Sequence, residues 1–343
     1  MREAFGATFI GPEGYLNSAT YGLPPKVTLN ALEALHRAWA EGSVSGPDFD
    51  AAVATARAGF AALAGVSIET VTMGGSVAAV LGPVAAAVPD GSRVLVARGE
   101  FTSVSFPFAA QHDRGVTVTE VPLADIPEAA PDHDVVAVST VQSADGARVD
   151  LSGLRAQTEG TDTTVILDAT QQLGWLRLDL GWADVVAGSS YKWLLGPRGV
   201  AWAAYSDRLA ERLVPHHANW YAGESPWDSI YGLPLRLARN ARRFDTSPAW
   251  FSVAGAAASL AWLTTVDHRA VTDHCLALAR TTRQALDLPP QESAIVSIPR
   301  EHAAARLQEA GLRAAVRQGA ARVSFHLYNT EDDVDRLIEA LRG

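Results

Sequence analysis

The chain has 343 residues, of which 48% are hydrophobic and 19% are charged, and its formal net charge at pH 7 is −10. This composition is typical of an ordinary globular protein with a large core, and it excludes a disordered or fibrous chain. The negative charge disfavours nucleic acid as a partner, because the sequence has no basic stripe that would displace counterions from phosphates.

Short β-branched segments alternate with helical stretches from Val71 to Ser206. A strand is expected at Thr70–Met73 and an alanine-rich helix at Ser76–Val88. Five further strands are expected at Arg93–Val96, Asp134–Thr140, Thr164–Leu167, Asp184–Ala187 and Val200–Tyr205. Nearly continuous apolar strands between helices predict an α/β fold with a mainly parallel sheet covered on both faces. In such sheets the functional sites lie at the carboxyl ends of the strands.

The pattern changes after Trp250. Long helical patterns cover Phe251–Leu286, and a last helix at Thr330–Leu341 opens with a Thr-Glu-Asp-Asp cap and first turn. Between them lie a strand at Ala294–Ile298, a helix at His302–Ala310 and two strand-like segments ending in Arg322–Leu327. We therefore expect a large α/β domain at residues 15–249 and a smaller α+β domain made of residues 1–14 and 250–343.

A lysine and an aspartate follow two of the expected strands. Lys192 lies in a Gly-Ser-Ser-Tyr-Lys-Trp-Leu-Leu-Gly-Pro-Arg-Gly segment, and Asp168 ends the apolar run before it. This pair predicts a site for pyridoxal 5′-phosphate (PLP). The lysine would hold the aldehyde as a Schiff base, and the carboxylate would keep the pyridine nitrogen protonated so that the ring can absorb carbanion charge.

A Gly74-Gly75-Ser76 turn opens the helix that follows the first strand. Free backbone N–H groups and the helix dipole at such a turn suit a phosphate. Taken alone, the turn is often just a helix cap, the aspartate a turn former and the lysine a solvated side chain. Their order along the chain, with Phe101 between them and a Gly-Pro-Arg-Gly segment after Lys192, is what favours the PLP site.

The chain resembles the class V aminotransferase and cysteine desulfurase family of fold-type I PLP-dependent enzymes over nearly its whole length. The resemblance is carried by the segments Tyr15–Ala19, Asp168–Gln171, Ser190–Lys192, Gly196–Gly199 and Arg322–Thr330. It implies the fold-type I PLP-dependent transferase fold, a PLP cofactor and an amino acid as the small-molecule substrate.

The resemblance also assigns roles around the cofactor ring. Lys192 would bind the cofactor and move protons at the substrate α-carbon, and Asp168 would pair with the pyridine nitrogen. Gln171 would donate to the phenolic oxygen, Phe101 would stack on the ring, and Gln142 would line the cofactor.

Further roles concern the phosphate and the substrate. The phosphate would be held by Gly75 and Ser76 together with Ser190 or Ser189. In the neighbouring subunit, Ser247 and also Thr246 would supply a hydroxyl to the phosphate, so that a homodimer shares its active sites. Arg322 would bind the substrate α-carboxylate in a two-pronged salt bridge, a geometry that suits guanidinium and not lysine.

The sequence departs from the family pattern at three positions that matter for the type of reaction. The segment 312–322, where desulfurases carry a nucleophilic cysteine, has none, and the single cysteine, Cys275, lies in a helical run. Phe101 stands where desulfurases have a ring-stacking histidine, and a phenyl ring carries no proton. Tyr191 replaces the histidine that commonly precedes the lysine, and the sequence assigns it no role.

Two other features carry no chemistry of their own. The adjacent His216 and His217 point apart and have no third ligand at suitable spacing, so no metal site is expected. The aromatic segment 216–231 is compatible with packing, with a dimer interface, or with a wall of the substrate pocket.

Transamination is the first functional expectation, because it needs only a lysine that shuttles one proton. A C–S lyase remains open, since the segment around Lys192 is similar to one in the sulfoxide lyases of ergothioneine biosynthesis, and so does an epimerase of the isopenicillin N type. A non-catalytic scaffold with this fold is disfavoured, because Lys192, Asp168 and Arg322 are all present.

Targeting signals are lacking in the sequence. No apolar run reaches the ~20 residues that would span a bilayer, and the N-terminus lacks a charged segment followed by an apolar one. We expect a cytoplasmic protein without a membrane partner.

Overall fold

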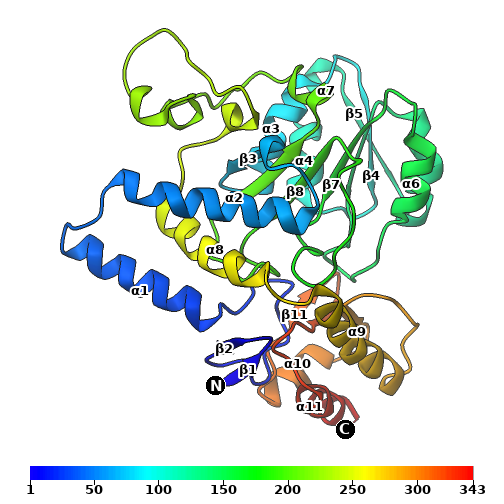
Figure 1. Cartoon of the computed structure of the whole chain (residues 1–343). Helices are drawn as coiled ribbons and strands as arrows, with labels where there is room; N and C mark the ends of the chain where they lie inside the picture. Colours follow the sequence, from blue (N-terminus) through cyan, green and yellow to red (C-terminus); the bar gives the residue numbers. More distant parts are fainter. Residues whose placement is uncertain (343) are drawn as a thin grey trace.

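A seven-stranded sheet forms the centre of the computed structural model, which describes residues 1–342 (Figure 1). Its strand order is β3-β9-β8-β7-β6-β4-β5. Strand β9 runs antiparallel to both neighbours, and the other strands are parallel to one another. The strands are β3 (Val71–Gly74), β4 (Arg93–Ala97), β5 (Thr117–Val121), β6 (Val135–Ser139), β7 (Thr164–Asp168), β8 (Val185–Ser189) and β9 (Ala201–Tyr205). The predicted α/β fold with a mainly parallel sheet is confirmed.

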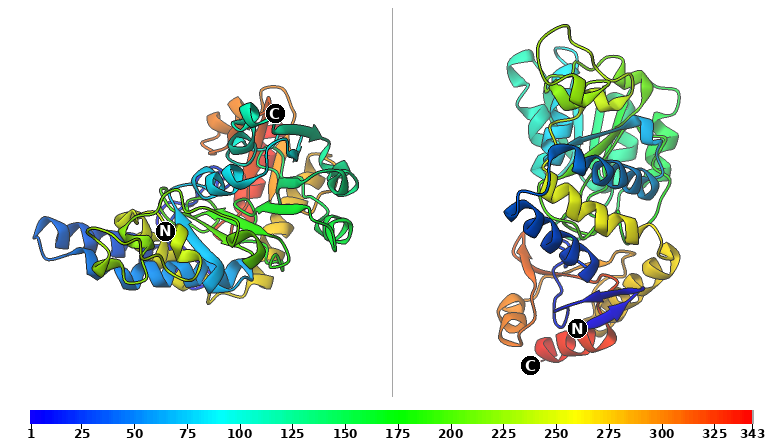
Figure 2. Two further views of the ribbon diagram at one scale, coloured as in Figure 1. Left: turned by 90° about the horizontal axis from the view of Figure 1, so that it is seen from above. Right: turned by 60° about the vertical axis from the view of Figure 1, so that its left-hand side comes forward.

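Helices cover both faces of this sheet. Neighbouring residues in a strand point to opposite faces, so Leu95 and Val94 belong to different hydrophobic clusters. The face of Leu95 packs against α2 (Asp50–Ala64), α5 (Ile126–Ala129), α6 (Leu151–Thr158) and α8 (Trp250–Leu263). The face of Val94 packs against α3 (Val77–Ala87), α4 (Thr102–Ala109) and α7 (Asp207–Ala210). Helix α1 (Lys26–Ala40) lies against α8 on the outside (Figures 1 and 2).

A smaller α+β unit lies below the sheet in Figure 1 and contains both termini. Its antiparallel sheet has the order β10-β12-β11, and a separate hairpin pairs β1 with β2. The elements are β1 (Arg2–Ala4), β2 (Ala7–Phe9), α9 (His268–Ala285), β10 (Ile295–Ile298), α10 (Ala303–Glu309), β11 (Ala315–Arg317), β12 (Ala320–Ser324) and α11 (Glu331–Arg342). The N-terminal hairpin is tied to α11 by an ion pair of 2.8 Å between Arg2 Nη1 and the buried Asp333 Oδ2.

We propose a division of the chain into these two units, with the boundary at residues 264–267 instead of 249/250. Helix α8 shares the core of the large sheet through Val253 and Leu260. Helix α9 starts after the turn, where the Asp267 side chain accepts hydrogen bonds from the backbone N–H of Arg269 and Ala270. That cap separates the two helices of the run 251–286.

The six strands expected between residues 70 and 206, and helices α3, α10 and α11, lie within two residues of their predicted bounds. The hairpin β1–β2, helices α1 and α2 and the short helices α4 to α7 had no predicted bounds. Strand β5 was not predicted, and its residues explain why: it is an edge strand whose side chains are all exposed or half-buried, so it lacks the apolar run of its neighbours. Within residues 1–342, no helix is both long and apolar enough to cross a membrane.

A buried ion pair joins the segment after residue 240 to helix α2, and hydrogen bonds of the same carboxylate join it to strand β3. Arg57 Nη2 lies 2.5 Å from Asp245 Oδ2, and both side chains are almost fully buried. Asp245 also accepts hydrogen bonds from the Met73 backbone N–H and the Thr72 hydroxyl. Removing one partner of such a pair costs about 3–5 kcal/mol, so the neighbouring Thr246 is firmly held beside the end of β3.

Candidate active site

A cavity of about 110 Å³ opens at the carboxyl ends of β6, β7 and β8. Lys192, Asp168, Gln171 and Phe101 line it, and so do Gly75, Ser76 and Ser189. Residues from distant parts of the sequence meet here because parallel strands end at the same edge of the sheet.

Lys192 is buried within this cavity, with only 5% of its surface exposed. Its Nζ lies 5.0 Å from the centre of the Phe101 ring and makes no ion pair with a described residue. Burial lowers the pKa of Lys192 to about 8; the charge of Asp168 opposes this shift, and Arg322, Arg317 and Arg198 reinforce it. About a tenth of the amine is therefore neutral and nucleophilic at pH 7, far more than for an ordinary lysine.

The lowered pKa predicts how pH controls covalent cofactor binding. Only the neutral amine attacks an aldehyde, so the capture rate of PLP by the apoprotein should rise about tenfold per pH unit below pH 8 and level off above it. Stopped-flow absorption measures this rate. The sequence contains two lysines, and the variant Lys26→Arg leaves Lys192 as the only side-chain amine. A rate that keeps rising to about pH 10 would show an ordinary lysine and contradict the structure.

Asp168 lies at the end of β7 with 4% of its surface exposed. Its Oδ1 accepts a hydrogen bond of 2.8 Å from the backbone N–H of Thr170. Burial raises the pKa of Asp168, while hydrogen bonds from Thr170 and the charge of Lys192 act in the opposite direction. A buried carboxyl group of this kind suits a protonated ring nitrogen as its partner.

The start of α3 forms the other end of the cavity. The Ser76 side chain caps the helix by accepting from Ala79 N–H at 3.2 Å, so the first turn of α3 faces the cavity with free backbone donors. Beside Gly75 there is open space, because a Cβ there would meet only the Gly199 carbonyl at 3.9 Å. Arg198 adds a positive charge to the wall. This set of donors fits a phosphate.

Three expected residues have side chains that are already bonded within the protein. The Ser190 hydroxyl donates to the Pro197 carbonyl, whereas Ser189 lines the cavity. Gln142 Nε2 donates to Glu100 at 2.9 Å. Both N–H groups of the Gln171 amide are engaged, by the Ala19 carbonyl and the Ser143 hydroxyl. A bond from Gln171 to a ring oxygen would have to replace one of these.

Glu100 explains the position of Gln142 and of Phe101. Its buried carboxylate accepts from the Ser139 backbone and hydroxyl, from Gln142 Nε2 and from the Phe101 backbone N–H. The pKa of Glu100 is raised by burial, and these hydrogen bonds oppose the shift. Glu100 thus fixes the turn that carries the Phe101 ring next to Lys192.

Arg322 is only 1% exposed, yet it pairs with no described carboxylate. Its Nη1 donates to the carbonyl and the hydroxyl of Ser143, and its Nη2 donates to the Thr20 hydroxyl at 2.5 Å. Its buried Nε has no hydrogen-bond partner. Burial, and to a lesser degree Arg317, lowers the pKa of Arg322 to about 10. A guanidinium that is buried, charged and short of one acceptor is suited to bind a carboxylate.

Thr246 and Ser247 do not line the cavity of their own chain. Thr246 donates its backbone N–H to the Met73 carbonyl at 3.0 Å, which places it behind the turn at Gly75. Their expected role, a hydroxyl contact to the phosphate, would therefore concern the active site of a second subunit.

Several wall residues were not predicted from the sequence, among them Thr170, Ser143, Tyr191 and Arg198. Thr170 lies between Asp168 and Gln171, and its hydroxyl accepts from Ser189 N–H at 3.2 Å. Arg198 stacks at 5.4 Å from the Tyr191 ring centre. Ser143 follows Gln142 at the end of a strand, and this position was the available signal.

Cys275 lies outside the site. It is fully buried in α9, and burial strongly raises the pKa of its thiol. A thiol of this kind is an inert part of the core and supplies no nucleophile.

The aromatic segment 216–231 packs on its own chain through two tryptophans. Trp220 and Trp227 lie 4.9 Å apart, and Trp227 Nε1 donates to Asp50. Neither lines the cavity of Lys192. Tyr231, at 88% exposure, points to solvent in the single chain.

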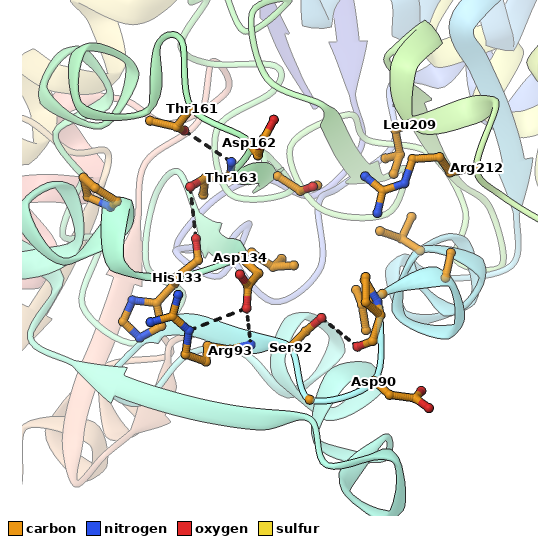
Figure 3. Close-up of a pocket in the computed structure, with 18 residues that line it drawn as sticks. Asp90, Ser92, Arg93, His133, Asp134, Thr161, Asp162, Thr163, Leu209 and Arg212 are labelled. Carbon is orange, nitrogen blue, oxygen red and sulfur yellow. Dashed lines mark hydrogen bonds and ion pairs between the residues drawn. The ribbon is translucent and has the colours of Figure 1, made fainter.

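A larger cavity of about 450 Å³ lies at the opposite edge of the sheet, at the amino ends of β4, β6 and β7 (Figure 3). Its polar groups are bonded to nearby backbone and side chains: Asp134 accepts from Arg93, and the Thr163 hydroxyl donates to the His133 carbonyl. It contains no buried lysine, and the candidate site is therefore the smaller cavity.

The donor set at the smaller cavity fits PLP. A buried amine with a lowered pKa, a buried carboxyl group and a helix N-terminus each match one part of the cofactor. Arg322 does not line the cavity, but it donates to the wall residue Ser143, and its unbonded Nε suits the carboxylate of an amino acid substrate. The fold and this site together define a PLP-dependent enzyme.

Comparisons with known proteins agree. Residues 15–308 match the family Aminotransferase class-V. An uncharacterized aminotransferase of Bacillus subtilis, YcbU, is 28% identical over 309 residues, which are 83% of this chain and 82% of that protein. Isopenicillin N epimerase of Amycolatopsis lactamdurans is 30% identical over 235 residues, 60% of this chain and 58% of the epimerase. The chain belongs to the class V aminotransferase family, as its sequence motifs predicted, and its cofactor is PLP.

Solved structures show the same fold. The cysteine desulfurase CsdA from Escherichia coli superposes with a TM-score of 0.82 at 20% identity and covers 96% of this chain and 94% of its own. The cystine C–S lyase C-DES, solved with its product cysteine persulfide, gives a TM-score of 0.82 at 19% identity, covering 95% and 96%.

Proposed function

We propose that the protein is an aminotransferase acting on an α-amino acid through Lys192. The observation that carries this proposal is the single buried amine in the cavity, with a phenyl ring where a second proton carrier would stand. Transamination needs one base that moves one proton, and Lys192 meets that need without a second group.

In this proposal, each residue around the cavity has a separate role in the reaction. PLP supplies an electron sink for the negative charge that develops when the α-proton leaves. Arg322 holds the substrate α-carboxylate, and Lys192 Nζ takes the proton from the α-carbon. Asp168 holds a proton at the ring nitrogen, and Ser76, Ser189 and the first turn of α3 hold the phosphate.

A homodimer with shared sites is part of this proposal. Thr246 and Ser247 are fixed beside the phosphate end but lie outside their own chain's cavity. The neighbouring loop exposes Tyr231 at 88% and Leu233 at 87%, an apolar surface that a second subunit would cover (Figure 1, yellow-green loop at the top left).

Epimerisation is the second candidate. It is favoured by the 30% identity to isopenicillin N epimerases from two organisms. It would need a proton donor besides Lys192, and the Tyr191 ring, centred 5.7 Å from Lys192 Nζ and lining the cavity, is the group available.

One product analysis separates the reactions. The holoenzyme is incubated with a panel of L-amino acids, with and without a keto acid acceptor, in D₂O. Transamination predicts more than one new keto acid per active site only when the acceptor is present. Pyruvate and ammonia released without an acceptor would identify a lyase, and deuterated D-amino acid without keto acid would identify an epimerase; either result would overturn the proposal. The matched control is Lys26→Arg, which keeps Lys192 and should behave as the native enzyme.

A further inference from the structure

We propose that Arg317 forms a second anion subsite beside Arg322 and selects amino acids whose side chain carries a carboxylate. This inference rests on the proposed function, because it names the substrate class of the same site. Arg317 has no role in the proposed reaction at the α-carbon.

The two arginines project from the same face of the β11–β12 hairpin. In this antiparallel pair, Ala315 lies opposite Arg322 and Arg317 lies opposite Ala320. Because side chains alternate between faces with a period of two, Arg317 and Arg322 share a face as diagonal neighbours, about 7–8 Å apart. The side chains converge on one atom: Thr20 Oγ1 accepts from Arg322 Nη2 at 2.5 Å and from Arg317 Nη2 at 3.3 Å.

Neither guanidinium is neutralised. Among residues 1–342, no carboxylate lies within ion-pair distance of Arg317 or Arg322. The only other hydrogen bond of the Arg317 side chain goes to the carbonyl of the adjacent Val316. Two partly or fully buried guanidinium groups held together by one hydroxyl repel each other, and an anion between them would relieve that repulsion.

The charges around Lys192 leave one cation without an assigned partner. Arg198, Arg317 and Arg322 all act on Lys192, in a protein whose net charge is −10. Arg198 belongs to the phosphate end, since it precedes Gly199, whose carbonyl faces Gly75. Arg322 is assigned to the α-carboxylate. Arg317 therefore remains for a second negative group on the substrate.

The hairpin tip holds Arg317 next to the site. Gln318 and Gly319 make the tight turn, with φ of 48° and 82°. The Gln318 amide reaches Gly99, where an added Cβ would lie 3.0 Å from its Nε2. Gly99 comes directly before the Glu100–Phe101 turn, so the tip of the hairpin lies against the turn that carries the ring beside Lys192. The second subsite is thus part of a short, closed hairpin.

The test uses acids that lack an amino group, so that binding is measured without any reaction. Calorimetric titration of the holoenzyme compares the diacids succinate and glutarate with the monoacids butyrate and valerate. We expect the better diacid to bind at least about tenfold more tightly than its monoacid, because a charge-assisted bond is gained. Arg317→Ala should remove this preference and leave monoacid binding unchanged, and Arg317→Lys should restore part of it.

The control is Arg313→Ala, which removes an exposed arginine just before the same strand and should leave the preference intact. Equal binding of diacid and monoacid by the native protein would overturn the inference. So would a preference that survives in Arg317→Ala, or a loss that affects both kinds of acid equally. Since no amino acid is present, these outcomes are independent of whether the enzyme transaminates.

Discussion

Replacing Lys192 by alanine should lower turnover by about 10⁴-fold, the upper end of the range for a general base, because in the proposed function the same residue would also anchor the cofactor. Among residues 1–342, no second amine lines the cavity that could replace Lys192. The only other lysine, Lys26, is exposed at the start of α1, and Phe101 carries no proton. Steady-state kinetics of keto acid formation measures the loss, and absorption of the purified protein shows whether the cofactor is still bound covalently.

Lys26→Arg is the matched control for this substitution and should keep full activity. Peptide mapping after borohydride reduction should find the cofactor on Lys192 in the native protein. Turnover in Lys192→Ala within tenfold of the native value would exclude Lys192 as the base.

Replacing Arg322 by alanine should lower kcat/KM by about 10²- to 10⁴-fold, since two charge-assisted bonds of about 1.5–3 kcal/mol each are lost. The effect should appear for every amino acid, because the α-carboxylate is common to all of them. Arg322→Lys should recover little, as an ammonium cannot replace the planar pair of donors.

Cofactor binding separates this effect from general damage. The absorption of the bound cofactor in Arg322→Ala should match that of the native protein, because Arg322 contacts Ser143 and Thr20 and not the expected ring or phosphate residues. A variant that loses the cofactor, or one that keeps its kcat/KM, would show that Arg322 is not the carboxylate-binding residue.

The sequence predicted the large sheet and its cofactor because both leave local signals. Buried parallel strands such as β6 and β7 are continuous apolar runs, and Asp168 and Lys192 follow such runs within recognisable motifs. Edge strand β5 and the break between α8 and α9 were missed, since an exposed edge has no apolar pattern and the break depends on a single capping aspartate, Asp267.

The hydrogen-bond partners of side chains within the site could not be predicted from the sequence. Gln171 and Ser190 stand in the expected motifs, but their hydrogen bonds go to Ser143, Ala19 and Pro197, and this depends on packing between distant segments. Arg317 and Arg322 both donate to the Thr20 hydroxyl, which precedes them in the sequence by 297 and 302 positions. Only the folded chain brings these groups together.

The most direct test of the aminotransferase proposal is a single turnover without acceptor. Holoenzyme is mixed with excess of the preferred amino acid, and keto acid, ammonia and the mass of the released cofactor are measured. The account predicts one keto acid per active site, no ammonia, and a cofactor that carries the amino group in place of its aldehyde oxygen. Continued formation of keto acid with equal ammonia, or an unchanged cofactor with no keto acid, would contradict it.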